Sequence, residues 1–326
     1  MKKLGLLVMP LMAVSFLASC GGEKEWYEDT TYINSLTTAD VTKENPDGSI
    51  GVVQTIKVNG LDHKVRLIGV DKDYEDEGKA KPIHTTWEFV DLLSDANGFS
   101  LAAYWNDTNT TSGSNYNYKD STIRACLNGT YDDPTKGSTK PINWFQYFGE
   151  NEDTEDTGKN RHFSTEYSNK SVLSMFPVDL VNVLKAPSKY ININDSGWKE
   201  KTVNDKLFLL SPVEMGNTGH QYEEPSTTVY SYYNDADDNR RIKHQINWHE
   251  GARTNSLEGT DLDGSYTTGR KRSYAGYNNN NGGYSWLRSP SISGGHGAWY
   301  VSSGGYLFAG NGVYGFAYAV APAFCI

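Results

Sequence analysis

The C-terminal part of this sequence constrains its fold most, because no charged side chain occurs between Ser289 and Ile326. The chain is 21% charged, so a segment of this length would ordinarily carry about eight such residues. Core strands exclude charges because burying an unpaired charge is costly. A recognition surface is the other interpretation, since Tyr, Ser, Gly and Asn are enriched in antibody contact loops. Besides Gly and Ser, the segment contains Trp299, Tyr300, Tyr306, Phe308, Tyr314, Phe316 and Tyr318.

The two interpretations apply to different parts of this segment. Residues 299–301 and 320–326 are rich in apolar side chains and predict strands. Residues 302–318 contain five Gly and few branched aliphatic side chains, so they are poor core material. We therefore expect residues 302–318 to form a recognition surface.

The composition of the whole chain excludes several classes of protein. Its 326 residues include 22 Tyr, 11 Phe and 8 Trp, far more buriable area than disordered chains carry. A net charge of -10 argues against nucleic-acid binding, which needs clustered Lys and Arg. Three Cys are too few for a disulfide-dense scaffold or a four-thiolate zinc site.

The N-terminus is typical of a targeting segment. Lys2 and Lys3 precede an apolar run over residues 4–17, which is too short to remain as a membrane-spanning helix. The run ends in Leu-Ala-Ser-Cys and resembles a bacterial lipoprotein signal, in which residues 1–19 are removed and Cys20 receives palmitate-like acyl chains. At about 0.8 kcal/mol per buried CH₂, such chains anchor a protein without a transmembrane helix. We expect a place in the bacterial cell envelope, at the outer membrane or cell surface; an ordinary secretory signal is the alternative.

The rest of the chain predicts a tether followed by one domain. Residues 20–48 are polar, lack apolar periodicity and predict a flexible, lipidated tether. Residues 49–326 show no composition shift and predict a single α+β domain with antiparallel strands, two or three helices and long loops. The expected elements are a hairpin around Asn59-Gly60 in residues 56–70, amphipathic helices in residues 86–93, 121–129 and 171–185, and a buried strand in residues 205–211.

No arrangement of reactive side chains predicts catalysis. The seven His lack the paired spacing of a zinc helix, and neither a nucleophile elbow nor a phosphate-binding glycine loop occurs. Residues 105–107 and 261–264 are similar to calcium-ligating segments but lack the other ligands of such sites. We therefore assign no catalytic residue, no metal and no cofactor. Whether Cys126 and Cys325 pair stays open, because spacing does not establish proximity.

Three C-terminal segments carry a resemblance to a known family. Residues 284–290 (Tyr-Ser-Trp-Leu-Arg-Ser-Pro), 298–301 and 319–326 resemble a C-terminal domain of unknown function that is common in bacterial surface and secreted proteins. That family resembles the C-type-lectin-like fold, which implies that the first and last strands pair and that long loops lie on top. The usual ending has an Arg before Pro-Ala-Phe, and Ala321 replaces it here, so an ion pair made by that Arg is missing.

The resemblance also extends to the variable proteins of diversity-generating retroelements. Mutagenesis of adenines in those systems converts Asn codons to Tyr, Phe, Ser, Gly, Ala, Val or His. Relatives commonly carry Asn runs in the segment that corresponds to residues 302–318, and the residues of this chain suit mutated Asn codons. These residues are Tyr306, Phe308, Ala309, Gly310, Asn311, Gly312, Tyr314, Gly315, Phe316 and Ala317.

Together these patterns favour a non-catalytic, lectin-like ligand-binding lipoprotein whose residues 302–318, within a variable-like C-terminal segment 284–326, contact a protein, glycan or phage ligand. Trp286 and Arg288 are expected to support the fold beneath that surface. An enzyme on a scaffold like that of the formylglycine-generating family, using Cys126 and Cys325, and a structural envelope or adhesin subunit are the alternatives. The predicted ligand contacts are His296, Tyr306, Phe308, Asn311, Tyr314, Phe316 and Tyr318.

Overall fold

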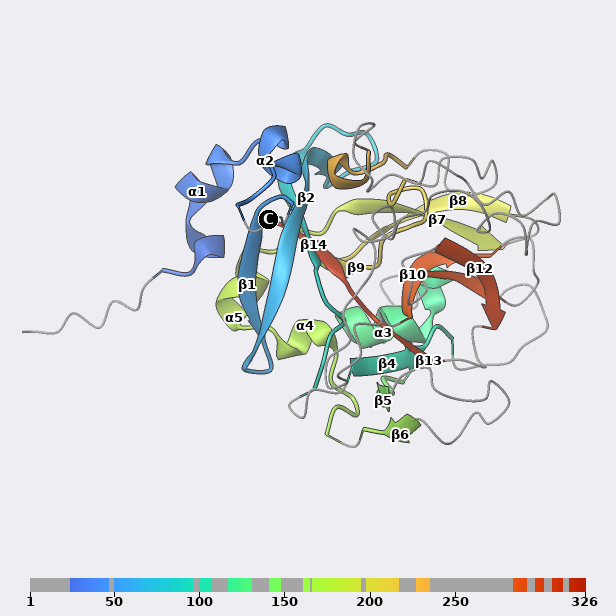
Figure 1. Cartoon of the computed structure of the whole chain (residues 1–326). Coiled ribbons are helices and arrows are strands. Elements are labelled where there is room, and N and C mark those ends of the chain that lie inside the picture. The colour runs from blue at the N-terminus through green and yellow to red at the C-terminus, as the bar shows by residue number, and fades with distance from the viewer. Residues whose placement is uncertain are drawn as a thin grey trace, which may run out of the picture.

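The structure is a computed structural model and describes thirteen stretches of the chain. It has a mixed α+β architecture in which two mainly antiparallel sheets and a separate hairpin are joined by short helices (Figure 1). The described stretches are residues 24–46, 50–95, 100–106, 117–130, 141–147, 161–164, 166–194, 198–216, 227–234, 284–291, 297–301, 307–312 and 317–326.

The first sheet has five strands in the order β1-β2-β3-β14-β9. The resemblance implied that the first and last strands pair, but this expectation is wrong. β1 lies at an edge of the sheet, whereas β14 pairs with β3 and β9. The chain thus inserts its last strand between two earlier ones. The strands are β1 (Val53–Val58), β2 (Leu61–Tyr74), β3 (Pro82–Phe89), β9 (Leu207–Phe208) and β14 (Ala323–Cys325).

The predicted hairpin is confirmed as β1 and β2. Val58 pairs with Leu61, so two residues make the turn. Both have positive φ angles, 49° at Asn59 and 81° at Gly60, as the tightest hairpin turns require. The Asn-Gly pair therefore sets the register of the sheet's first two strands.

The prediction of a helix in residues 86–93 is wrong, because residues 86–89 form the end of β3. Thr86, Trp87, Glu88 and Phe89 are all buried, because β3 is an interior strand with both faces covered. Burial on both faces removes the alternation by which a half-buried strand is recognised. The buried strand predicted in residues 205–211 is present as the short β9.

The second sheet has seven strands in the order β12-β11-β10-β13-β4-β5-β6. Its pairs are antiparallel apart from β10 and β13, which run parallel. The strand predicted at residues 299–301 lies in β11, and residues 302–318 supply β12 and the start of β13. The strands are β4 (Ser100–Tyr104), β5 (Phe145–Tyr147), β6 (Arg161–Phe163), β10 (Ser285–Pro290), β11 (Gly297–Val301), β12 (Leu307–Gly312) and β13 (Ala317–Ala319).

The remaining elements are a hairpin and short helices. The hairpin consists of β7 (Ser188–Asn194) and β8 (Trp198–Asn204). The helices are η1 (Trp26–Glu28), α1 (Thr30–Ser35), α2 (Thr38–Thr42), η3 (Tyr118–Asp120), α3 (Thr122–Asn128), α4 (Val172–Met175), α5 (Val178–Val183) and η4 (Ser231–Tyr233).

Two of the predicted helices are present, one of them divided. α3 matches the prediction for residues 121–129, with the Ser121 hydroxyl accepting from the Arg124 N–H as its N-cap and Gly129 at its C-cap. The helix predicted in residues 171–185 is split into α4 and α5 at Pro177. Phe176 is extended, at φ -77° and ψ 150°, because a residue before proline avoids the helical region.

The prediction of a flexible tether is wrong for residues 24–46, which form η1, α1 and α2. Each helix buries at least one side chain, including Tyr27, Ile33 and Val41. Asp29 caps α1 by accepting from two backbone N–H groups. The apolar residues of three short helices follow no common period, which is why the segment has no helical pattern in its sequence.

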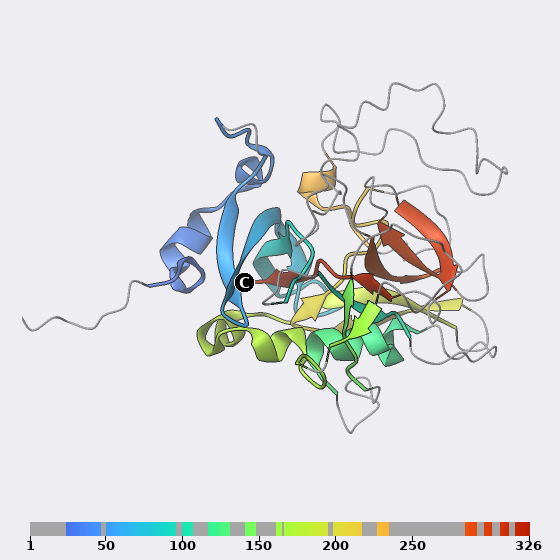
Figure 2. The ribbon, with the colours of Figure 1, turned by 60° about the horizontal axis from the view of Figure 1, so that its bottom comes forward.

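The main hydrophobic core runs through the described part of the chain, from Tyr27 to Cys325, and a small separate cluster forms around Ala102 and Ala317. The N-terminal helices lie at one end of the molecule and strands β10 to β12 at the other, as Figures 1 and 2 both show. None of the described helices combines the length and the apolar character needed to cross a membrane.

Candidate functional site

Five aromatic rings gather on one face of the seven-stranded sheet, and we call this set the aromatic platform. Trp286 on β10 lies opposite Tyr300 on β11, which in turn lies opposite Phe308 on β12. Residues directly opposite in neighbouring strands share a face, so the register brings these rings together. The platform consists of Tyr284, Trp286, Tyr300, Phe308 and Tyr318.

The rings of the platform contact one another in a continuous row. Tyr300 and Phe308 are stacked, with 5.7 Å between ring centroids and 19° between ring planes. Tyr284 and Tyr318 are stacked at 5.0 Å and 21°, and Trp286 lies 4.5 Å from Tyr318. Aromatic pairs at such separations attract each other by about 0.5–1.5 kcal/mol beyond area burial. The rings therefore hold one another in place.

The platform has a buried part, which we call its base, and a partly exposed part, which we call its top. Trp286 and Tyr318 are only 1% and 7% exposed, respectively. Tyr284, Tyr300 and Phe308 are half-buried and reach the solvent. A rigid aromatic base with ring area at the surface is suited to binding by stacking and apolar contact.

The platform includes some of the predicted ligand contacts. Phe308 is one of its half-buried rings. Asn311 lies in the same edge strand, β12, three residues further along the chain. Tyr318, another predicted contact, is only 7% exposed and packs against Trp286, so it supports the neighbouring rings of the platform. The other predicted contacts and the predicted lipidation site lie outside the described residues; they are His296, Tyr306, Tyr314, Phe316 and Cys20.

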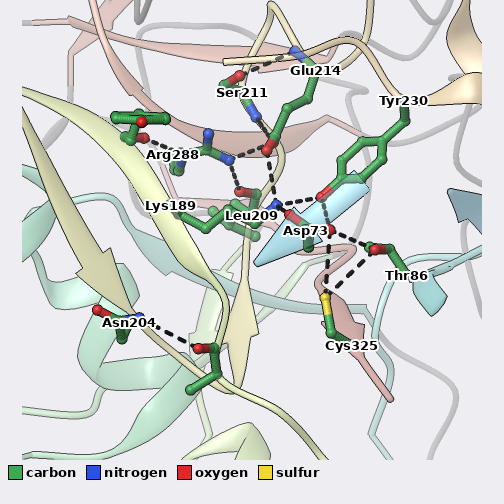
Figure 3. A network of polar contacts seen from close by, with 12 residues as sticks. Asp73, Thr86, Lys189, Asn204, Leu209, Ser211, Glu214, Tyr230, Arg288 and Cys325 are labelled. Carbon is green, nitrogen blue, oxygen red and sulfur yellow. Dashed lines mark hydrogen bonds and ion pairs between the residues drawn. The ribbon is translucent and has the colours of Figure 1, made fainter. Parts of the chain in front are cut away.

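A network of buried charges links β10 to the first sheet (Figure 3). Lys189 donates hydrogen bonds to Asp73 and to the Tyr230 hydroxyl. It also donates to Glu214 at 3.1 Å, and Glu214 accepts a further bond from Arg288. All these side chains are buried. Two cations thus face two carboxylates, which makes their burial tolerable.

Arg288, which the sequence analysis assigned to structural support, is fully buried. Its guanidinium donates to the carbonyl oxygens of Tyr190 and Leu209, both at 3.0 Å, in addition to Glu214. These bonds connect β10 to β7 and to the segment that follows β9. Arg288 therefore positions the strand that carries Trp286.

Burial and pairing act against each other on the pKa values of the network. Burial opposes ionisation of Asp73, but the Lys189 ammonium together with hydrogen bonds from Lys189, Thr86 and Tyr230 holds the pKa of Asp73 below its ordinary value. Burial likewise opposes the charge of Lys189, yet Asp73 and Glu214 raise its pKa. Burial raises the pKa of Tyr230 and Cys325 well above their ordinary values. The carboxylate and ammonium are thus ionised while the phenol and thiol are neutral.

A second buried ion pair fixes η4 to the first sheet. Arg66 Nε donates to Glu88 at 2.7 Å, and its terminal nitrogens donate to the hydroxyls of Tyr232 and Tyr233 at 2.8 and 3.2 Å. The Tyr233 hydroxyl donates to Glu88 at 2.5 Å. Tyr230, Tyr232 and Tyr233 are therefore all held by buried charges.

A small polar pocket opens beside the network. The hydroxyl oxygens of Ser188 and Thr227 are buried there without a hydrogen-bond partner. The three donors of the Lys189 ammonium are already used, so it offers no charge to a ligand. Within the described stretches, no group of His, Cys, Asp and Glu is arranged to hold a metal ion. The lining residues are Lys72, Asp73, Tyr74, Asp76, Glu77, Lys79, Ser188, Lys189, Tyr190, Glu214, Thr227, Thr228 and Tyr230.

The two cysteines of the described residues, Cys126 and Cys325, are buried and form no disulfide with each other. The Cys325 sulfur lies 3.5 Å from the Thr86 hydroxyl and from an Asp73 carboxylate oxygen. The Cys126 thiol donates to the Asn143 carbonyl at 3.8 Å. Because burial raises the pKa of Cys325, its reactive thiolate form is disfavoured. The oxidative-enzyme alternative, which needs both thiols beside an open cleft, gains no support.

Comparison with known families identifies most of this chain. Residues 92–326 match a domain of unknown function, DUF6273. The chain belongs to this family. The DUF6273 region contains the whole aromatic platform, whereas β1, β2 and the N-terminal helices precede it. No curated protein and no solved structure matches the chain.

The buried network was missed by sequence reasoning. Asp73 and Lys189 are separated by 116 positions, and Lys189 and Tyr230 by 41. The available signal was weak: Lys189 stands beside the apolar, strand-like Tyr190 and Ile191. A charged residue in such a run is expected to pair with a buried residue of opposite charge, but the sequence does not identify that residue.

Proposed function

We propose that this protein is a non-catalytic ligand-binding lipoprotein of the bacterial cell envelope, and that the aromatic platform is the centre of its binding surface. The observation that carries the proposal is the arrangement of Tyr284, Tyr300 and Phe308, which are half-buried and lie in one ring cluster with the buried Trp286 and Tyr318. Rings fixed before binding lose little conformational entropy on contact, so they supply binding area at low cost.

The chain topology supports this placement. Residues 302–306 connect β11 to β12, and residues 313–316 connect β12 to β13, so both connections begin and end at strands of the platform. They contain Tyr306, Tyr314 and Phe316, three of the predicted contacts. The ligand is a protein, a glycan or a phage component.

The same proposal includes a lipid anchor, a fold family and genetic diversification. The lipid anchor is attached at Cys20, and the fold is a variant of the C-type-lectin-like fold with antiparallel sheets and long connections. Residues 302–318 are diversified by a retroelement. A near-copy of their coding sequence downstream, differing mainly at adenines and beside a reverse-transcriptase gene, supports diversification; a genome without such a copy removes that part alone.

The binding role is tested by removing the top of the platform. The double variant Tyr300→Ala/Phe308→Ala is compared with Tyr104→Ala/Phe145→Ala, which removes the aromatic pair of β4 and β5. Both are assayed for thermal stability and for retention on a glycan array and on immobilised phage particles. The proposal expects the first variant to lose binding while keeping most of its stability, with binding intact in the second. Equal loss in both, or collapse of stability in the first alone, assigns the platform to the core.

A further inference from the structure

The proposed lipid anchor lies very close to the folded part of the chain. Cys20 precedes Lys24, the first described residue, by four positions. Even a fully extended chain covers at most about 14 Å over four residues. The inference that follows rests on the proposed anchor and concerns the face of the protein that meets the membrane.

The N-terminal helices do not lengthen the distance between the lipid anchor and the folded body, because they are bound to the first sheet. The Trp26 indole N–H donates to the Thr55 carbonyl at 2.8 Å, and its ring packs 4.6 Å from that of Trp87. Gln54 donates to the Tyr32 hydroxyl at 2.7 Å. Side-chain burial and hydrogen bonds thus hold this segment along its first turns.

The attachment continues to the end of the segment. The Val52 N–H donates to the Asp40 carbonyl at 3.1 Å, and the Gly51 N–H donates to the Lys43 carbonyl at 2.8 Å. Tyr27 and Val41 are buried in the same core as β3. Residues 24–46 are therefore part of the folded body. Only the four-residue segment from Cys20 to Lys24 separates the lipid anchor from that body.

The surface beside this attachment point carries an exposed apolar side chain. α5 packs against η1, and Val178 at the start of α5 is 72% exposed. Among the described residues, Val53 is the one other large hydrophobic side chain that is exposed, at 37%. The acidic Glu25, Glu28 and Asp179 lie near Tyr27 at this end, where burial and these charges raise the pKa of Tyr27 to about 12.

We propose that the end of the molecule formed by η1 and α5 lies against the lipid headgroups, with Val178 entering the interface. The headgroup layer takes up several ångströms of the roughly 14 Å available, so η1 cannot move far from the bilayer. The platform then faces away from the membrane, because β10 to β12 lie at the opposite end of the molecule (Figures 1 and 2). The acidic residues at the contacting end favour a zwitterionic surface over an anionic one.

The test measures how close each end lies to a bilayer. The acylated mature protein, which begins at Cys20, is reconstituted in phosphatidylcholine vesicles that contain a lipid with a nitroxide on its headgroup. A fluorophore is attached to Val178→Cys or, at the far end, to Lys201→Cys in β8. Labelling is selective because Cys126 and Cys325 are 0% exposed and Cys20 is acylated. Quenching at position 178 is expected to exceed that at position 201 about two-fold or more, given the short reach.

Two insertions of the same flexible linker provide the controls. Twenty Gly and Ser residues, spanning about 25 Å on average, placed between Glu23 and Lys24 should abolish the difference between the two labels. The same linker placed after Pro46 should leave it unchanged, because the N-terminal helices stay bound to the sheet. A loss of the difference with the second linker shows that residues 24–46 act as a tether and overturns the inference.

The acylation state separates this inference from the function on which it rests. Equal quenching at both positions in protein whose mass shows acyl chains on Cys20 overturns the orientation alone. Absence of acyl chains on Cys20 in the envelope fraction overturns the anchor and, with it, the orientation. Loss of ligand binding by the platform variant leaves the orientation standing.

Discussion

The ring of Trp26 packs against that of Trp87 with 4.6 Å between centroids, and this contact joins the N-terminal helices to an interior strand of the first sheet. Trp87 is fully buried in β3, whereas Trp26 is half-buried and donates to the Thr55 carbonyl of β1. One side chain thus contacts two strands. The contact makes residues 24–46 part of the folded body.

Replacing Trp26 by Ala should release the N-terminal helices. Trp→Ala in a core costs about 3–5 kcal/mol, and because Trp26 is half-buried we expect about 2 kcal/mol. Urea unfolding followed by circular dichroism measures the loss, and limited proteolysis should cut within residues 24–46. Lys24→Ala, which changes an exposed residue, is the control. A variant that resists proteolysis like the wild type contradicts the role of Trp26.

Replacing Lys189 by Met should be among the most damaging single changes. It leaves the buried carboxylates of Asp73 and Glu214 without their ammonium partner, which costs about 3–5 kcal/mol. Adding Asp73→Asn should restore part of the loss, because one carboxylate is then neutral. Lys57→Met is the matched control: it breaks an exposed ion pair with Asp62 and should lower the free energy of unfolding far less than Lys189→Met does. Equal losses from the two Lys variants contradict the prediction.

His63 should make the protein less stable in mild acid. Burial lowers the pKa of His63 despite the nearby Asp91 and Asp62, and its Nε2 has no hydrogen-bond partner. The unfolded chain therefore binds a proton more readily, and stability is lost as pH falls below about 6.5. Asp73, whose pKa is lowered, contributes a separate loss below about pH 4.

The His63→Phe variant isolates this effect. Phe retains the contact with the Phe89 ring, which lies 5.6 Å from the imidazole, and does not titrate. Urea unfolding at pH 7 and pH 5 should show a smaller decrease in the variant than in the wild type. Parallel pH dependence in the two proteins contradicts the assignment to His63.

The native thiols should be unreactive while the protein is folded. Cys126 and Cys325 are buried, and burial raises the pKa of Cys325. Iodoacetamide at pH 8 should therefore leave both unmodified, as mass spectrometry of peptides can show. The same treatment in urea should modify both. Rapid modification of Cys325 in the folded protein would reopen the interpretation of this chain as an oxidative enzyme.

Local signals predicted the elements that local interactions determine. The Asn59-Gly60 turn supplies both positive φ angles of the hairpin, and Ser121 and Gly129 mark the two ends of α3. The interpretation of residues 86–93 as a helix was wrong because β3 is covered on both faces. β3 is also an interior strand only because β14, more than two hundred residues later, pairs with it.

The candidate site was predictable in kind but not in detail. The uncharged, aromatic composition of the C-terminus pointed to the strands of the platform. The composition did not predict which rings are buried and which reach the solvent. Tyr300 and Tyr318 are the same residue type, and their different exposure depends on their places in β11 and β13. The buried network depends on contacts between distant segments, for which the order of residues gives no register.

The position of β14 between β3 and β9 has a kinetic consequence. Backbone bonds join Thr85 and Ile326 across 241 positions, so the first sheet cannot close until nearly the whole chain is available. Such long-range pairing folds slowly because loop closure is costly in entropy. The first sheet of a newly made chain is therefore completed only after its last residues have been synthesised.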